Sequence, residues 1–72
     1  MTYRTNIDGK YYSFNNSGSL VESYILACGI AFLLDWTQIP ITLEVLRGKR
    51  WIIWEPTERD KLVIEAYLQP DN

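Results

Sequence analysis

The feature that most constrains the fold is one long apolar stretch, residues 19–38, SLVESYILACGIAFLLDWTQ. Ser19 and Glu22 have the spacing of a capping box, which satisfies the free N–H groups where a helix begins. The pattern predicts a helix over residues 19–38 that ends before Pro40, because the residue preceding a proline avoids the helical region. The predicted buried stripe, spaced as one helical face, consists of Val21, Ile25, Phe32 and Trp36.

Two segments before this stretch have the composition of a β-hairpin. Residues 1–7 and 10–15 are rich in β-formers, and Asp8-Gly9 between them is the strongest short indication of a type I′ turn. After the helix, residues 41–47 alternate with period two and residues 50–55 follow a tight turn at Gly48-Lys49. These four segments are predicted strands.

The segment 57–68 is compatible with two structures. A strand is favoured by period-two alternation, in which one face would carry Leu62, Ile64, Ala66 and Leu68. Thr57 and Asp60 also have capping-box spacing, which would begin a helix running through Leu68. We therefore expect a single small α+β domain over residues 1–72, with an antiparallel sheet and one long central helix packed on one face. The order is β-β-α-β-β-β, with a helix as the alternative for the last element.

The charge balance bears on partners and compartment. Nine acidic and seven basic residues give a net charge of −2, whereas nucleic-acid binders are normally basic. A single cysteine cannot form an internal disulfide, and no signal peptide is recognisable, so we expect a cytoplasmic protein. The uncharged residues 24–34 are too few for a bilayer span of about 20, so we expect no membrane anchor.

The residue types that carry most catalysis are scarce. The chain has no histidine, and its four glycines match no phosphate-binding or dinucleotide motif. Cys28 lies among apolar helix residues and is expected to be a small buried side chain. Glu44 and Glu65 could share a face as paired carboxylates, but two solvated charges are the simpler interpretation. We expect no enzyme activity, no metal and no cofactor.

Strand parity predicts an apolar surface on the back of the sheet. One face of the sheet is expected to pack against the helix through Leu43, Val45, Ile52, Trp54, Leu62 and Ile64. The residues between them then face away from the helix. Large aromatic residues on such a face are typical anchors of an interface. The predicted partner-binding residues are Trp51, Tyr67, Val63, Ile53, Leu46, Glu44 and Glu65.

Two further surfaces offer alternatives. The helix is apolar on nearly all sides, so its outer face could form a homodimer. That predicted dimer face consists of Leu20, Ala27, Ile30, Ala31 and Leu34. The basic cluster Arg47, Lys49 and Arg50 could contact nucleic acid, although a solvated hairpin tip is the simpler interpretation.

In size and pattern the chain is similar to many small phage-encoded inhibitors, including some anti-CRISPR proteins. They share a lone acidic-to-neutral α+β domain without an active site. The resemblance implies an inhibitor that acts in the host cytoplasm on a larger protein or complex. Our leading hypothesis is a non-catalytic protein-binding module, an inhibitor or adaptor that occupies a surface of its partner. The alternatives are a nucleic-acid-binding domain and a structural homodimer.

Overall fold

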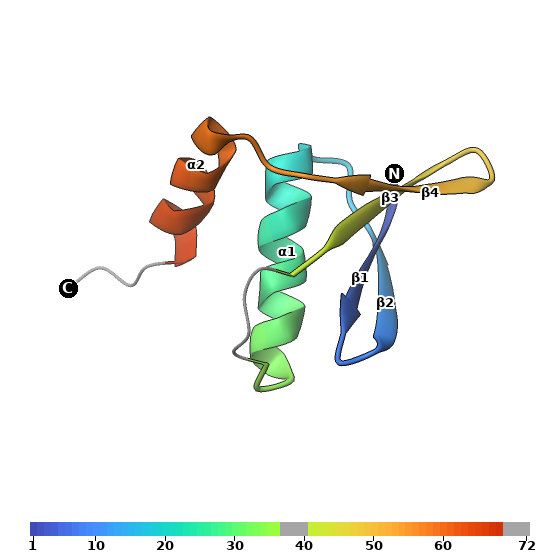
Figure 1. Ribbon diagram of the computed structural model, residues 1–72, viewed down its shortest axis with the longest axis horizontal. Helices are drawn as coiled ribbons and strands as arrows, with labels where there is room; N and C mark the ends of the chain where they lie inside the picture. The colour runs from blue at the N-terminus through green and yellow to red at the C-terminus, as the bar shows by residue number, and fades with distance from the viewer. Residues whose placement is uncertain (37–40, 69–72) are drawn as a thin grey trace.

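The computed structural model describes residues 1–36 and 41–68, which form four strands and two helices (Figure 1). In chain order these are β1 (Thr2–Ile7), β2 (Lys10–Asn15), α1 (Leu20–Leu33), β3 (Leu43–Arg47), β4 (Arg50–Trp54) and α2 (Glu58–Leu68). The α+β class, the first helix and the four strands are therefore confirmed. Among the described residues, neither helix is both long and apolar enough to cross a lipid bilayer.

The four strands form one antiparallel sheet in the order β2-β1-β3-β4. Asp8 and Gly9 both have positive φ, 55° and 82°, so the predicted type I′ turn joins β1 to β2. Gly48 has a φ of 63° as the first residue of the two-residue turn between β3 and β4, as a type II′ turn requires. Pairing of β1 with β3, with Tyr3 opposite Val45, joins these two hairpins.

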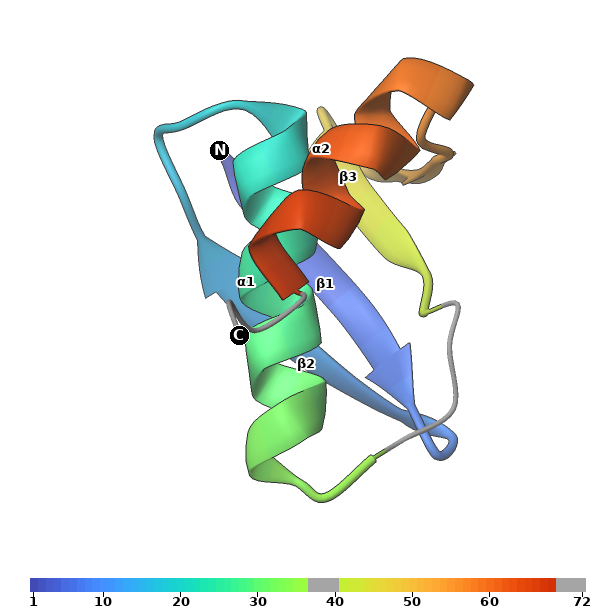
Figure 2. The same ribbon diagram turned by 90° about the vertical axis from the view of Figure 1, so that its left-hand side faces the viewer.

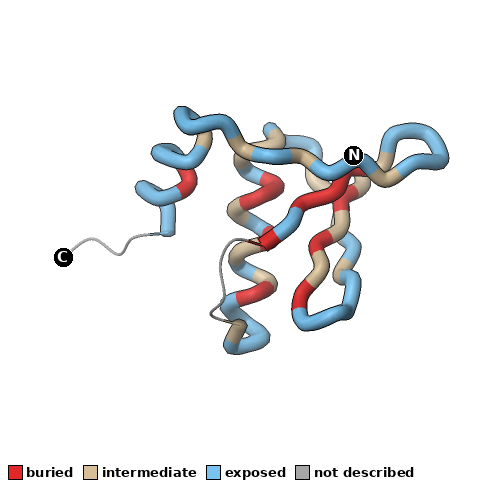
Figure 3. Tube along the Cα trace, viewed as in Figure 1, coloured by how far each residue is buried: buried red, intermediate tan, exposed pale blue. Residues whose placement is uncertain are grey.

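Both helices lie on one side of the sheet, and α1 lies between the sheet and α2 (Figures 1 and 2). The face towards α1 carries the core, and the burial is concentrated on β1, β3 and the inner side of α1 (Figure 3). The buried hydrophobic residues are Tyr3, Ile7, Tyr24, Ala27, Ala31, Ile41, Leu43, Val45 and Ile64. Thr5 is also fully buried, where its hydroxyl donates a hydrogen bond of 2.7 Å to the Thr42 carbonyl.

The first helix is shorter than predicted. Its beginning is as expected, since the Ser19 hydroxyl accepts a hydrogen bond from the Glu22 N–H at 3.1 Å. It ends at Leu33 because Asp35 adopts a left-handed φ of 56°. The N–H groups of Asp35 and Trp36 then bond to the carbonyls of Phe32 and Ala31, as in a Schellman motif. Gln38 and Pro40, the predicted end, lie outside the described residues.

The helix face assigned from the sequence was wrong in part, since Val21, Ile25 and Trp36 of the predicted stripe do pack against the core as half-buried residues. Ala27 and Ala31, predicted to lie on an outer dimer face, are buried against the sheet, and Phe32 of the predicted core stripe is 79% exposed. Small side chains let the helix approach the strands closely, while the larger Tyr24 fills the space beside Trp54. The rest of the predicted dimer face, Leu20, Ile30 and Leu34, ranges from half-buried to exposed.

The preferred strand assignment for residues 57–68 was also wrong, and the helical alternative holds. Thr57 and Asp60 form a reciprocal capping box, in which each backbone N–H bonds to the other side chain at 3.0 and 3.1 Å. Of this helix only Ile64 is buried, whereas Leu62, assigned to the inner face, is 68% exposed. The sequence of this segment fits the helical period almost as well as the strand period, so its contact with α1 decided between the two structures.

The helix end at Asp35 gives a stability prediction. A Cβ at a φ of 56° is strained, and a carboxylate at a helix C-terminus opposes the helix dipole. We expect Asp35→Gly to raise the free energy of unfolding by about 1 kcal/mol, measured by urea denaturation. Asp35→Ala is the control, because it removes the charge but keeps the Cβ. Equal stability of the two variants would contradict a strained backbone at this position.

Candidate functional site

The face of the sheet opposite the helices carries a cluster to which every strand contributes one side chain. The members, which we call the back-face cluster, are Tyr11 of β2, Arg4 of β1, Glu44 of β3 and Trp51 of β4. Strand register places Arg4 directly opposite Glu44, so the central pair of the cluster lies on the two inner strands. The cluster therefore spans the full width of the sheet.

Arg4 is the centre of the cluster. Its Nη2 lies 2.9 Å from Glu44 Oε1, in an ion pair whose two side chains are 23% and 11% exposed. The guanidinium carbon lies 3.9 Å from the centroid of the Tyr11 ring and 4.4 Å from that of Trp51. Both distances are within the range of a cation–π interaction, which strengthens as the groups lose water. The guanidinium thus lies over both aromatic rings at once.

The structure brings together four of the seven predicted partner-binding residues. As strand parity predicted, the back face carries Leu46, Trp51 and Ile53 together with Glu44. Of these, the Ile53 side chain is 60% exposed. Val63, Glu65 and Tyr67 do not belong to this face, because they lie on α2. This part of the prediction was wrong for the same reason as the strand assignment.

Sequence reasoning missed two members of the site, Arg4 and Tyr11. Their place on the back face could have been predicted from the hairpin register. The Asp8-Gly9 turn aligns β1 with β2, and the alternation of side chains along each strand then places both residues on the face opposite Tyr3. Nothing in the sequence showed that this hairpin lies beside β3, so Arg4 could not be matched with Glu44 or Trp51.

The basic cluster lies at the end of the β3–β4 hairpin. Arg47, Lys49 and Arg50 are all exposed there, in agreement with a solvated hairpin tip. The interpretation of Glu44 and Glu65 as two solvated charges holds for Glu65, which is exposed on α2, but was wrong for Glu44, which is buried against Arg4. The alternative, a carboxylate pair, is not formed either. Within the described residues, no three side chains of a metal-binding type gather in one place.

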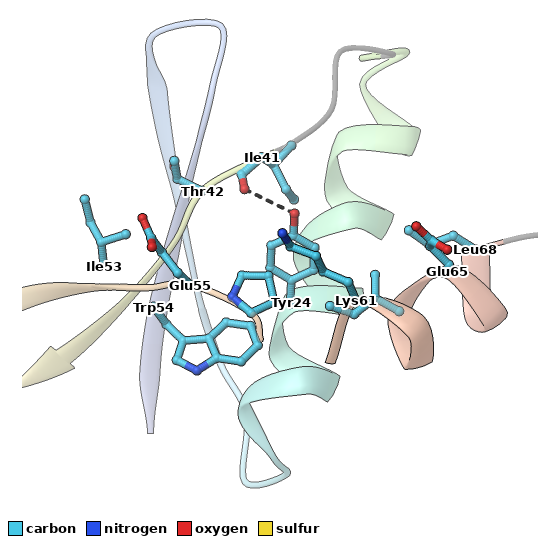
Figure 4. A pocket seen from close by; sticks show the side chains of 11 residues that line it. Tyr24, Ile41, Thr42, Ile53, Trp54, Glu55, Lys61, Glu65 and Leu68 are labelled. Atoms are coloured by element: carbon cyan, nitrogen blue, oxygen red, sulfur yellow. Dashed lines mark hydrogen bonds between the residues drawn. The ribbon is translucent and has the colours of Figure 1, made fainter. Parts of the chain in front are cut away.

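A cleft of about 720 Å³ separates α2 from the end of the sheet (Figure 4). Tyr24 lies at its inner side and donates a hydrogen bond of 3.3 Å to the Ile41 carbonyl. Ile53 and Glu55 lie on the sheet side, and Lys61, Glu65 and Leu68 on the α2 side. The cleft exists because α2 contributes only one buried side chain to the core.

Cys28 is half-buried on α1, as a small apolar-type residue in contact with the core. Burial raises the pKa of its thiol from 9.0 to about 11. Burial also raises the pKa of Tyr24, the nearby Cys28 raises it further, and the hydrogen bond to Ile41 opposes both effects. Neither group is poised to act as a base or nucleophile near neutral pH.

A scan against protein-family models, a search of curated proteins and a search of solved structures found no match to this chain.

The ion pair gives a second stability prediction. Glu44→Gln should lower the free energy of unfolding by about 1–3 kcal/mol, because the half-buried Arg4 guanidinium loses its counter-charge. Glu65→Gln is the matched control on exposed α2, and we expect it to stay within about 0.5 kcal/mol of the wild type. If urea denaturation shows a similar loss of unfolding free energy in both variants, the Arg4–Glu44 ion pair adds no more to stability than an exposed charge does.

Thiol labelling tests the environment of Cys28. With a pKa of about 11 in place of 9.0, the thiolate fraction at pH 8 is about a hundredfold lower than in the unfolded chain. We expect labelling of the native protein to be slower by at least this factor than labelling in urea. Stability should also fall as the pH rises from 9 towards 11, because the unfolded state releases the thiol proton first. Labelling at equal rates in the two states would contradict the burial.

Proposed function

We propose that this chain is a non-catalytic protein-binding module that docks through the back of its sheet and blocks a surface of a larger partner. One observation carries the proposal: a Trp, a Tyr and an Arg are stacked together on a sheet face that α1 and α2 do not cover. A few residues supply most of the binding energy at protein interfaces, and Trp, Tyr and Arg are enriched among them. Leu46 and Ile53 beside them add apolar surface.

The order within the cluster supports binding by rigid anchors. Arg4 holds the Tyr11 and Trp51 rings, so a partner would not have to immobilise them. Immobilising a flexible side chain costs roughly 0.5–1.5 kcal/mol, and preorganisation avoids that cost. An inhibitor or adaptor that acts by occlusion needs such a surface and no reactive group, which suits a chain without histidine. The likeness to small phage-encoded inhibitors, including some anti-CRISPR proteins, is one of size and α+β pattern and involves no specific motif.

The nucleic-acid alternative has weaker support. A base would stack on an open aromatic face, but the Arg4 guanidinium already lies over the Trp51 ring. The basic residues Arg47, Lys49 and Arg50 form a small exposed group in a chain whose net charge is −2. Phosphate neutralisation by so few residues gives little affinity at physiological salt.

Paired aromatic substitutions test the proposed surface. We expect Trp51→Ala to weaken binding of a captured host protein by about 2 kcal/mol or more, roughly thirtyfold in Kd, because Trp51 is an anchor. Tyr67→Ala is the matched control, since Tyr67 is an exposed aromatic residue on α2. Partners would be captured with the wild type, and their affinities for each folded variant measured by calorimetry.

The opposite pattern would refute the proposed face. If Tyr67→Ala loses the partner and Trp51→Ala keeps it, the binding surface lies on α2. If only Lys49→Ala loses binding and affinity falls steeply with salt, the hairpin tip binds a polyanion.

A further inference from the structure

The outer edge of β4 is unpaired among the described residues, since β4 is the last strand of the sheet. In a two-residue hairpin the flanking residues, here Arg47 and Arg50, form the hydrogen-bonded pair, and such pairs alternate along the ladder. The backbone N–H and C=O groups of Trp51 and Ile53 therefore point away from β3. Within residues 1–36 and 41–68 these groups have no hydrogen-bond partner, so they form a row of available donors and acceptors.

This edge lacks the usual features that prevent pairing. Its central residues are Trp51, Ile52, Ile53 and Trp54, with no charge, proline or glycine among them. Ile52 and Ile53 are 48% and 60% exposed. Natural sheets normally protect an edge with lysine, proline, a bulge or a covering element. An exposed apolar edge of this kind is a template for another strand.

The charges at the two ends of β4 favour a second copy of this chain as the occupant. Lys49 and Arg50 precede the apolar residues, and Glu55 follows them. Antiparallel pairing of two identical strands places the basic beginning of one against the acidic end of the other. We infer that β4 pairs with β4 of a second copy about a two-fold axis at Ile52, which joins the two sheets into one.

The register follows from the charges. With Ile52 opposite its own copy, Trp51 lies opposite Ile53. Lys49, in the turn just before β4, then comes next to Glu55 of the second copy, just after β4. Trp51 and Ile53 are the residues with outward backbone groups, so this register also forms the hydrogen bonds. Centring the pair on Ile53 would place Trp51 opposite Glu55 and lose both ion pairs.

The dimer leaves the back-face cluster open. A two-fold axis perpendicular to the sheet keeps both back faces on one side and both sets of helices on the other. The helix α2 packs against α1 and does not extend the sheet beyond β4 (Figure 1). This dimer therefore differs from the helix-mediated dimer considered from the sequence, and it does not depend on the proposed function.

Sedimentation velocity over a range of protein concentrations tests the dimer. We expect a concentration-dependent dimer that is lost in Ile53→Pro, because proline removes an outward N–H, and kept in Ile53→Val. Circular dichroism would confirm that both variants fold. A protein that stays monomeric at every concentration overturns the inference. The edge of β4 would then be available to a strand of a different protein. A dimer that survives in folded Ile53→Pro places the interface elsewhere and overturns it too.

Charge reversal tests the register. Lys49→Glu and Glu55→Lys should each raise the dimer Kd about tenfold or more, because each change creates two like-charge contacts. The double variant should restore the wild-type Kd. Lys49 and Glu55 of one chain lie roughly 20 Å apart along the strand, so contact within one chain cannot explain a rescue. Failure of the double variant to recover would overturn the register.

A disulfide offers an independent check that does not depend on affinity. In a Cys28→Ala background, Ile52→Cys should oxidise to a covalent dimer, because the Cα atoms of this non-hydrogen-bonded pair lie about 4.5 Å apart, within the range that a disulfide bridges. Ile53→Cys is the control, since Ile53 is more exposed but does not meet its own copy. Faster cross-linking of Ile53→Cys would overturn the proposed axis.

Discussion

The pairing of β1 with β3 is the contact on which the rest of the structure depends. Each hairpin is encoded by its own turn, but neither has a stable core alone. Where the two hairpins join, Arg4 forms an ion pair with Glu44, 40 positions away in the sequence. Thr5 forms a hydrogen bond to Thr42, 37 positions away. The entropy lost in closing this loop is offset by burial of Tyr3 and Leu43 beneath α1.

The same junction creates the candidate site. Arg4 reaches Glu44 only because the inner strands are neighbours, and Trp51 lies over the guanidinium only because β4 follows β3 in the sheet. The back face is apolar only along β3 and β4, because the register places Thr2, Asn6 and Ser13 on the same face as Arg4. A partly buried charge on this face is still costly unless it is paired. The Glu44 carboxylate and the two aromatic rings offset part of that cost, although the buried Arg4 Nε has no hydrogen-bond partner among the described residues.

The site could be predicted in part. Alternation along β3 and β4 correctly assigned Leu46, Trp51 and Ile53 to the back face, because period two is a local property of any strand. The same reasoning failed for Val63, Glu65 and Tyr67, since residues 57–68 satisfy a helical period almost as well as alternation. Arg4 and Tyr11 were missed because strand order depends on contacts distant in sequence.

The sequence alone determined the features that depend on neighbouring residues. These are the Asp8-Gly9 turn, the Ser19 cap and the strand parity, all set by backbone sterics and short-range hydrogen bonds. Only the tertiary structure decided which side of α1 is buried. A helix that is apolar on nearly all sides has no preferred face of its own, so close packing on the strands selected Ala27 and Ala31.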